Sequence, residues 1–149
     1  MKLTTRGRFA VNAMLDLVKH TENNAPVRLE DISQRQQISK PYLEQLFNKM
    51  KHTGLVKSLR GPGGGYVLAI PANEINIAQI IDAVEDSMDA SVCQGQANCL
   101  NGGECLAHRL WQNLSVVMHQ YLSSVSLADM HNLPDATVAF QAAFKNTNE

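Results

Sequence analysis

A glycine-dense loop, Arg60-Gly61-Pro62-Gly63-Gly64-Gly65, constrains the fold of this chain more than any other segment. It joins two short runs of β-forming residues, 55–59 and 66–70, and this arrangement predicts an antiparallel hairpin. No Lys-Ser or Lys-Thr pair follows the glycines, so the loop is not a Walker A phosphate loop. The strand-like run after it does not suit a dinucleotide-binding turn either. Two interpretations remain, an ordinary hairpin turn or the wing of a winged helix-turn-helix domain.

Upstream of the hairpin, apolar periodicity predicts helices over residues 8–20, 30–36 and 39–53. Ser39 is placed to cap the third helix, and Gly54 is placed to end it. The first helix is expected to bury a broad apolar face made by Phe9, Val11, Ala13, Leu15, Leu17 and Val18. The third is expected to bury Leu43, Leu46, Phe47 and Met50. Helix, short helix, turn, longer helix and hairpin is the order of a winged helix-turn-helix, so the predicted fold class is mainly α with a small β wing.

The opposite face of helix 39–53 is polar enough to enter a major groove. It carries Lys40, Tyr42, Glu44, Gln45, Asn48, Lys49 and Lys51. The loop glycines would let backbone approach the sugar-phosphate chain, and Arg60 at the base of the loop could reach into a narrow minor groove. Lys2, Arg6 and Arg8 are placed to meet phosphates. The acidic and amide side chains of the polar face would equally suit a solvated surface.

Charge is divided unevenly along the chain. The net charge of the 149 residues is −1, but residues 1–60 hold 11 Lys and Arg against 5 Asp and Glu, while residues 61–149 hold 2 against 9. This asymmetry indicates a first half that meets a polyanion and a second half that does not, although chance clustering of solvated charges would look similar.

All three cysteines of the chain, Cys93, Cys99 and Cys105, lie close to His108 with the spacing C-x5-C-x5-C-x2-H. An odd number of clustered thiols fits metal ligation better than disulfide pairing. Structural zinc sites usually show shorter gaps between cysteines, and a 2Fe–2S centre with three thiolates and one imidazole suits the wide gaps better. Incomplete cysteine ligation favours a labile centre, which suits a sensor.

Two other interpretations of these residues stay open. Cys105 and His108 lie one helical turn apart, as a catalytic pair would, but no oxyanion loop or orienting carboxylate stands out. His108 near a helix start would also suit a surface or capping residue. Its spacing from Cys105, which places both on one helical face, favours ligation.

Two further helices are predicted, over residues 75–84 with Asn76 as the cap and over 106–125 after the cysteine loop. The second presents Leu106, Leu110, Leu114, Val117, Met118, Tyr121 and Val125 on one side. The predicted organisation is a DNA-binding domain over 1–75, a cluster-binding loop with a dimerisation helix over 76–130, and a partly disordered tail over 131–149.

Several segments agree, in order and spacing, with one bacterial family. They are Leu3-Thr4 with Arg6-Gly7-Arg8, Ala13-Met14-Leu15-Asp16, Tyr42-Leu43-Glu44-Gln45-Leu46-Phe47, Arg60 to Tyr66, and the cysteine loop with His108. Through them the chain resembles, from Met1 to about Leu127, the winged-helix transcription factors of the IscR type, a family that also includes NsrR and CymR. NsrR lacks this histidine and can use an N-terminal carboxylate, whereas residue 8 here is Arg. CymR lacks the cluster cysteines.

The resemblance implies a homodimer bridged by the long helix, bound to near-palindromic, double-stranded promoter DNA. It implies a 2Fe–2S cluster on Cys93, Cys99, Cys105 and His108, supplied by the cluster-assembly machinery, whose occupancy reports iron–sulfur supply and changes which promoters are bound. The implied DNA contacts are Ser39, Tyr42, Glu44 and Gln45 in the major groove, Arg60, Gly63 and Gly64 at the wing, and Lys2, Arg6 and Arg8 on phosphates. Pro41 departs from the family pattern, which usually has a small polar residue at the start of this helix.

The chain is expected to act in the cytoplasm, without membrane contact and without enzymatic activity. No apolar run approaches the length of a membrane span, and polar residues interrupt the stretch after the basic N-terminus, which argues against a signal peptide. The remaining alternatives are a nitric-oxide or redox-sensing regulator of the same family, a structural-zinc DNA-binding protein, and a small electron-transfer protein.

Overall fold

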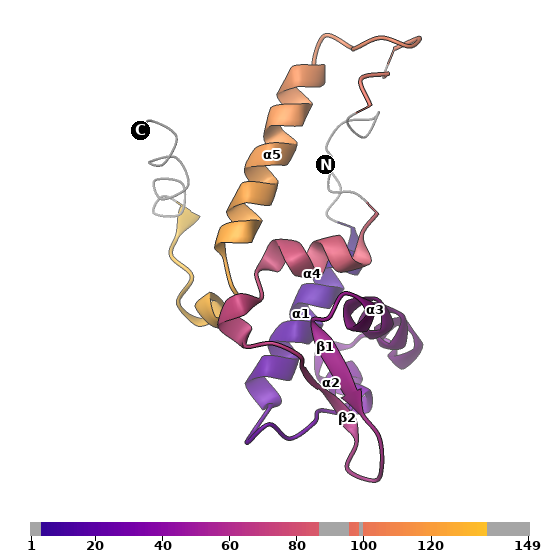
Figure 1. Ribbon diagram of the computed structural model, residues 1–149, viewed down its shortest axis with the longest axis vertical. Coiled ribbons are helices and arrows are strands. Elements are labelled where there is room, and N and C mark those ends of the chain that lie inside the picture. The colour runs from indigo at the N-terminus through magenta and orange to yellow at the C-terminus, as the bar shows by residue number, and fades with distance from the viewer. Residues whose placement is uncertain (1–3, 87–95, 99, 137–149) are drawn as a thin grey trace.

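The computed structural model describes residues 4–86, 96–98 and 100–136 of the chain. Its elements are α1 (Thr5–His20), α2 (Leu29–Gln36), α3 (Lys40–His52), β1 (Val56–Leu59), β2 (Gly65–Leu68), η1 (Ala72–Glu74), α4 (Ile77–Val84), α5 (His108–Ser124) and η2 (Ala128–Asn132). Helices dominate, and the described residues form a single two-stranded sheet, β1–β2. The predicted fold class, mainly α with a small β wing, is confirmed (Figure 1).

The turn between α2 and α3 is tight because Gln37 adopts a left-handed conformation, with φ 55° and ψ 43°. Its N–H donates to the Ser33 carbonyl, and the Ser33 hydroxyl donates to the Ile38 carbonyl at 2.5 Å. α3 then begins after Ser39, as predicted, and Gly54 follows its end with φ 80°. Ser39 is an N-cap by position only, since its hydroxyl makes no capping hydrogen bond.

The predicted hairpin is confirmed, and its register pairs Leu59 with Gly65 across the loop. Val27, which precedes α2, bridges to Tyr66 with N···O distances of 2.9 and 2.8 Å. A Cβ atom at Gly65 would lie 2.4 Å from the Val27 carbonyl oxygen. Glycine at this position therefore lets the hairpin dock on the helical body.

The core lies between α1, α3 and α4. All four residues predicted on α3 are buried, with exposed fractions of 1% or less. On α1 the predicted broad apolar face packs against the core, but only part of it is fully buried. The fully buried face consists of Ala10, Ala13, Met14 and Leu17. The flanking Phe9, Val11, Leu15 and Val18 are only partly buried at its edges.

Helix α4 begins with the predicted Asn76 cap, which forms a capping box with Gln79 at 2.9 Å in both directions. After α5 the chain returns alongside the start of α4. The Ile77 N–H donates to the Val125 carbonyl and the Leu127 N–H to the Ile75 carbonyl, both at 2.9 Å. These bonds fix one end of α5, and the rest of the helix rises from α4 away from the wing (Figure 1).

Several predictions fall outside the described residues, namely Lys2, Cys93, Cys99 and residues 137–149 of the tail. The division of the chain at residues 75 and 130 stays a prediction. Within the described ranges, no helix is both long enough and apolar enough to cross a bilayer.

Candidate nucleic-acid interface and metal centre

Helix α3 presents its predicted polar residues outward, because its apolar stripe is occupied by the core. Ser39, Glu44 and Gln45 are exposed. Tyr42 is half-buried, and its ring meets the edge of Phe9 with centroids 5.9 Å apart and an interplanar angle of 81°. Tyr42, a predicted DNA contact, therefore also supports the contact between α1 and α3.

At the start of α3, Lys40 lies between two acidic side chains. The Lys40 Nζ lies 2.5 Å from an oxygen of Glu30 on α2 and 4.0 Å from an oxygen of Glu44. The hydrogen bond from Lys40 lowers the pKa of Glu30, and the same bond raises the pKa of Lys40. A phosphate that approached Lys40 would have to compete with Glu30, so this pair tunes the positive charge available at the helix start.

The wing glycines have different local roles. A Cβ atom at Gly64 would lie 2.4 Å from the Leu59 carbonyl oxygen and 2.9 Å from that of Gly61, whereas Gly63 has no atom within 4 Å of such a Cβ. The turn itself therefore requires Gly64, and only Gly63 is left without an internal reason to be glycine. Arg60 is exposed beside them.

The predicted phosphate contacts near the N-terminus are not equivalent. Arg8 is exposed, but the Arg6 guanidinium lies 3.9 Å from Glu85 and 3.6 Å from Asp86. Sequence reasoning missed Glu85. No local pattern marks it, because 78 residues separate it from Gly7, to which it is hydrogen-bonded.

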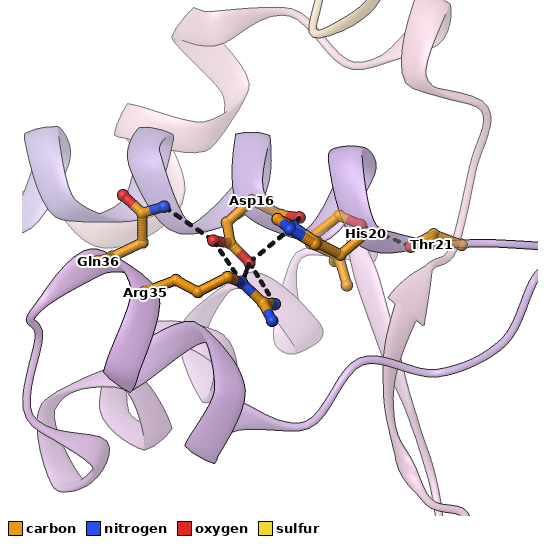
Figure 2. A network of polar contacts seen from close by, with 6 residues as sticks. Asp16, His20, Thr21, Arg35 and Gln36 are labelled. Atoms are coloured by element: carbon orange, nitrogen blue, oxygen red, sulfur yellow. Dashed lines mark hydrogen bonds and ion pairs between the residues drawn. The ribbon is translucent and has the colours of Figure 1, made fainter.

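The buried carboxylate of Asp16 fastens α2 to α1. Asp16 accepts hydrogen bonds from Arg35 Nη2 at 2.7 Å, from Arg35 Nε at 3.1 and 3.2 Å, and from Gln36 Nε2 at 2.7 Å (Figure 2). His20 Nδ1 lies 3.4 Å from the same carboxylate. Burial raises the pKa of Asp16, but the hydrogen bonds from Arg35 and Gln36 and the charges of Arg35 and His20 outweigh it, so the pKa is lowered.

Of the four predicted cluster ligands, the structure describes Cys105 and His108. His108 is the first residue of α5 and only 4% exposed, and its N–H donates to the Cys105 carbonyl at 3.1 Å. Among the described residues no group of three or more His, Cys, Asp or Glu is arranged to hold a metal ion. A thiol and an imidazole at one helix start are nonetheless the donor types that iron or zinc takes, so the described pair fits such a group.

A tight reversal precedes this pair. The Leu100 and Gly103 backbones exchange hydrogen bonds of 3.0 and 2.7 Å, and Asn101 and Gly102 between them have φ angles of 44° and 84°. Two successive positive φ angles are the signature of a two-residue hairpin turn. The chain between the second and third predicted cysteine ligands is thus folded back on itself.

Comparison with known proteins gives consistent results. Residues 3–133 match the family model Rrf2, described as an iron-dependent transcriptional regulator. A candidate HTH-type transcriptional regulator of Neisseria meningitidis serogroup A is 59% identical over 127 residues, which are 85% of each chain. The HTH-type transcriptional regulator IscR of Photorhabdus laumondii is 52% identical over 132 residues, covering 89% of this chain and 80% of that protein.

Two solved structures are similar to the whole described fold. The structure of T. potens IscR superposes with a TM-score of 0.71 at 32% identity and covers 93% of this chain and 96% of that one. CymR, the global cysteine regulator of B. subtilis, gives a TM-score of 0.74 at 31% identity and covers 91% and 99%. These relatives are transcription regulators and not enzymes.

Proposed function

The chain belongs to the Rrf2 family of transcriptional regulators, and from this premise we propose that it is a dimeric promoter-binding protein whose DNA affinity depends on a 2Fe–2S cluster. Family membership was the expectation drawn from the motifs, and it is confirmed. The cluster, the dimer and the individual contacts are the proposal. Promoter binding would place its action in the cytoplasm.

The DNA part of the proposal is supported by the outward face of α3 and the wing beside it. Glu44 and Gln45 are exposed on α3, and Lys51 near its end donates to Ser58 of β1 at 3.0 Å, which ties helix and wing together. A helix with a polar outer face entering the major groove, next to an arginine-bearing wing at the minor groove, is the docking geometry of this class. Arg8 would meet phosphate directly.

The regulatory part is supported by the placement of His108. A buried imidazole at the start of the projecting helix, with Cys105 in the preceding turn, joins the cysteine loop to α5. Cys93 and Cys99 would complete the ligand set. When bound, a 2Fe–2S cluster would cross-link this loop and supply a redox-sensitive group that can be lost. The cluster-assembly machinery is the proposed donor.

The dimeric part is supported by the apolar face of α5. Leu110 is 61% exposed and Val117 is 36% exposed. The two residues lie on the same face of the helix, about two turns apart. An apolar helix face this open on a chain of this size marks an interaction surface. A second copy would cover it, consistent with the two-fold symmetry that a near-palindromic site requires.

The test is chemical analysis of the protein purified without oxygen. Two irons and two sulfides per chain, with the visible and EPR spectra of a 2Fe–2S centre that are lost in Cys105→Ala, are the expected result. One zinc per chain in place of iron would contradict the cluster and favour the structural-zinc alternative. A different result would favour the nitric-oxide sensor: the cluster reacts with nitric oxide, and DNA binding then changes under conditions in which oxygen and iron depletion leave it unchanged.

A further inference from the structure

A carboxylate at the end of α4 holds the first turn of α1. Glu85 Oε1 accepts the N–H of Gly7 at 2.9 Å and the hydroxyl of Thr4, and the Glu85 side chain is only 4% exposed. Gly7 is the third residue of α1, so its N–H has no partner within the helix. α1 has no acidic residue in its own first turn, and the Thr4 hydroxyl does not cap the helix. Glu85 therefore takes the capping role from a distance in sequence.

The fit around this carboxylate is close. A Cβ atom at residue 7 would lie 3.1 Å from Glu85 Oε1, so glycine lets the carboxylate reach the backbone. The Arg6 guanidinium lies 3.9 Å from the other Glu85 oxygen. It also lies 3.6 Å from Asp86, whose side chain is 87% exposed. Arg6 is thus held by acidic residues at the position where the sequence predicted a phosphate contact.

Glu85 also lies between the end of α4 and the part of the sequence that leads to Cys93. It follows α4, which is fixed to the core through Ile80 and Ile81, and the segment leading to Cys93 begins two residues later. On the other side of the contact, the same turn of α1 carries Arg6 and Arg8. One buried side chain thus ties the end of α4 to the predicted phosphate-contacting turn of α1.

We propose that Glu85 is the positioning residue that couples the cysteine loop to DNA binding, through its hold on the first turn of α1. When Glu85 is displaced, the turn that carries Arg6 and Arg8 loses its cap. This inference rests on the proposed function, because it names the route by which the loop would regulate the DNA surface. Coupling of this kind is measured as a ratio of affinities.

The first experiment needs no cluster. Amide hydrogen exchange of the cluster-free protein should show Gly7 protected in the wild type and exchanging at least about tenfold faster in Glu85→Ala. Glu85→Gln retains an oxygen acceptor and should keep most of the protection. Asp86→Asn, which removes the neighbouring exposed charge, is the matched control and should leave Gly7 unchanged. Equal Gly7 exchange in the wild type and Glu85→Ala would overturn the proposal.

The second experiment measures the ratio of DNA dissociation constants between cluster-free and cluster-loaded protein. Glu85→Ala should bring this ratio to within about twofold of unity, while Asp86→Asn keeps the wild-type ratio. A wild-type ratio that persists in Glu85→Ala would overturn the coupling role alone. A wild-type ratio of unity would contradict the proposed cluster regulation as well, so the two failures are distinguishable.

Discussion

Helices α3 and α5 are both amphipathic, but they differ in how much of the apolar face is buried within the chain. α3 buries Leu43, Leu46, Phe47 and Met50 against α1 and α4. α5 is longer, at 17 residues against 13, but the only buried residue within it is His108. Its Leu110 remains 61% exposed. The apolar stripe of α3 is thus buried inside the chain, whereas the stripe of α5 stays exposed at Leu110 and Val117.

This difference separates two kinds of stability. The helix-turn-helix half has a complete core, so its folding should not depend on protein concentration. The exposed part of the α5 face, at Leu110 and Val117, would be buried only by a second surface, so its association should depend on protein concentration. A regulator built this way can change its assembly or the orientation of its halves without unfolding the part that meets DNA.

The largest expected effect is on the α3 side of the comparison. Phe47→Ala should lower the free energy of unfolding by about 3–5 kcal/mol, because the ring is fully buried and packs 4.9 Å from the Tyr66 ring. Urea denaturation at two protein concentrations measures this loss, which should be the same at both. Asn48→Ala on the exposed face of α3 is the control and should change stability by no more than about 0.5 kcal/mol. An equal loss in both variants would contradict the account of the core.

The next effect concerns the polar link between α1 and α2. Asp16→Asn should cost about 2–3 kcal/mol at neutral pH, since Arg35 loses its partner but is itself partly hydrated. Because the folded state lowers the pKa of Asp16 from its ordinary 3.8, this contribution is present above that value and disappears as the pH falls below it. Unfolding free energies measured from neutral to acidic pH should therefore converge for wild type and variant below about pH 4. A difference that grew with acidity would contradict this sign.

A charged substitution on α5 tests whether its exposed apolar face forms the dimer interface. Leu110→Glu should raise the dissociation constant of the dimer at least about thirtyfold, because it would place a carboxylate on the apolar face that the second copy is proposed to cover. Sedimentation equilibrium measures it. Gln112→Glu adds the same charge about 200° around the helix and is the control. The two variants should unfold alike at low concentration, and equal dimerisation in both would show that this face is not the interface.

The smallest effects sharpen the contrast between structure and binding within the wing. Gly64→Ala should lower stability by about 1–3 kcal/mol, because its Cβ would collide with the Leu59 and Gly61 carbonyl oxygens. Gly63→Ala should leave stability within about 0.5 kcal/mol of the wild type but weaken DNA binding, since nothing inside the protein opposes the added methyl group. Thermal unfolding and DNA titration of both variants separate the two roles. Unchanged affinity in Gly63→Ala would remove that glycine from the interface.

Features that arise from local sequence were predicted well. The stripe on α3, the Asn76 cap and the hairpin each depend on residues within one or two turns of one another. The misses are contacts between distant segments. The buried Asp16 carboxylate, for example, binds Arg35 and Gln36 of α2, which lie 19 and 20 residues further along the chain.

The candidate site shows the same limit. Arg6 was assigned to phosphate from its charge and position, but its acidic partners come from the end of α4, which periodicity alone could not place beside α1. Of the predicted ligands, Cys105 and His108 lie at one helix start. Cys93, Cys99 and Lys2 remain predictions from spacing and resemblance.

The most direct test of the account is a DNA titration at several salt concentrations, with cluster-loaded and cluster-free protein on duplexes selected from genomic DNA. The expected results are two chains per duplex and an affinity that differs between the two forms. The expected slope of log affinity against log salt is about −4 or steeper, from about −0.9 per phosphate contact. A single chain per duplex, or an affinity that neither salt nor the cluster changes, would contradict it.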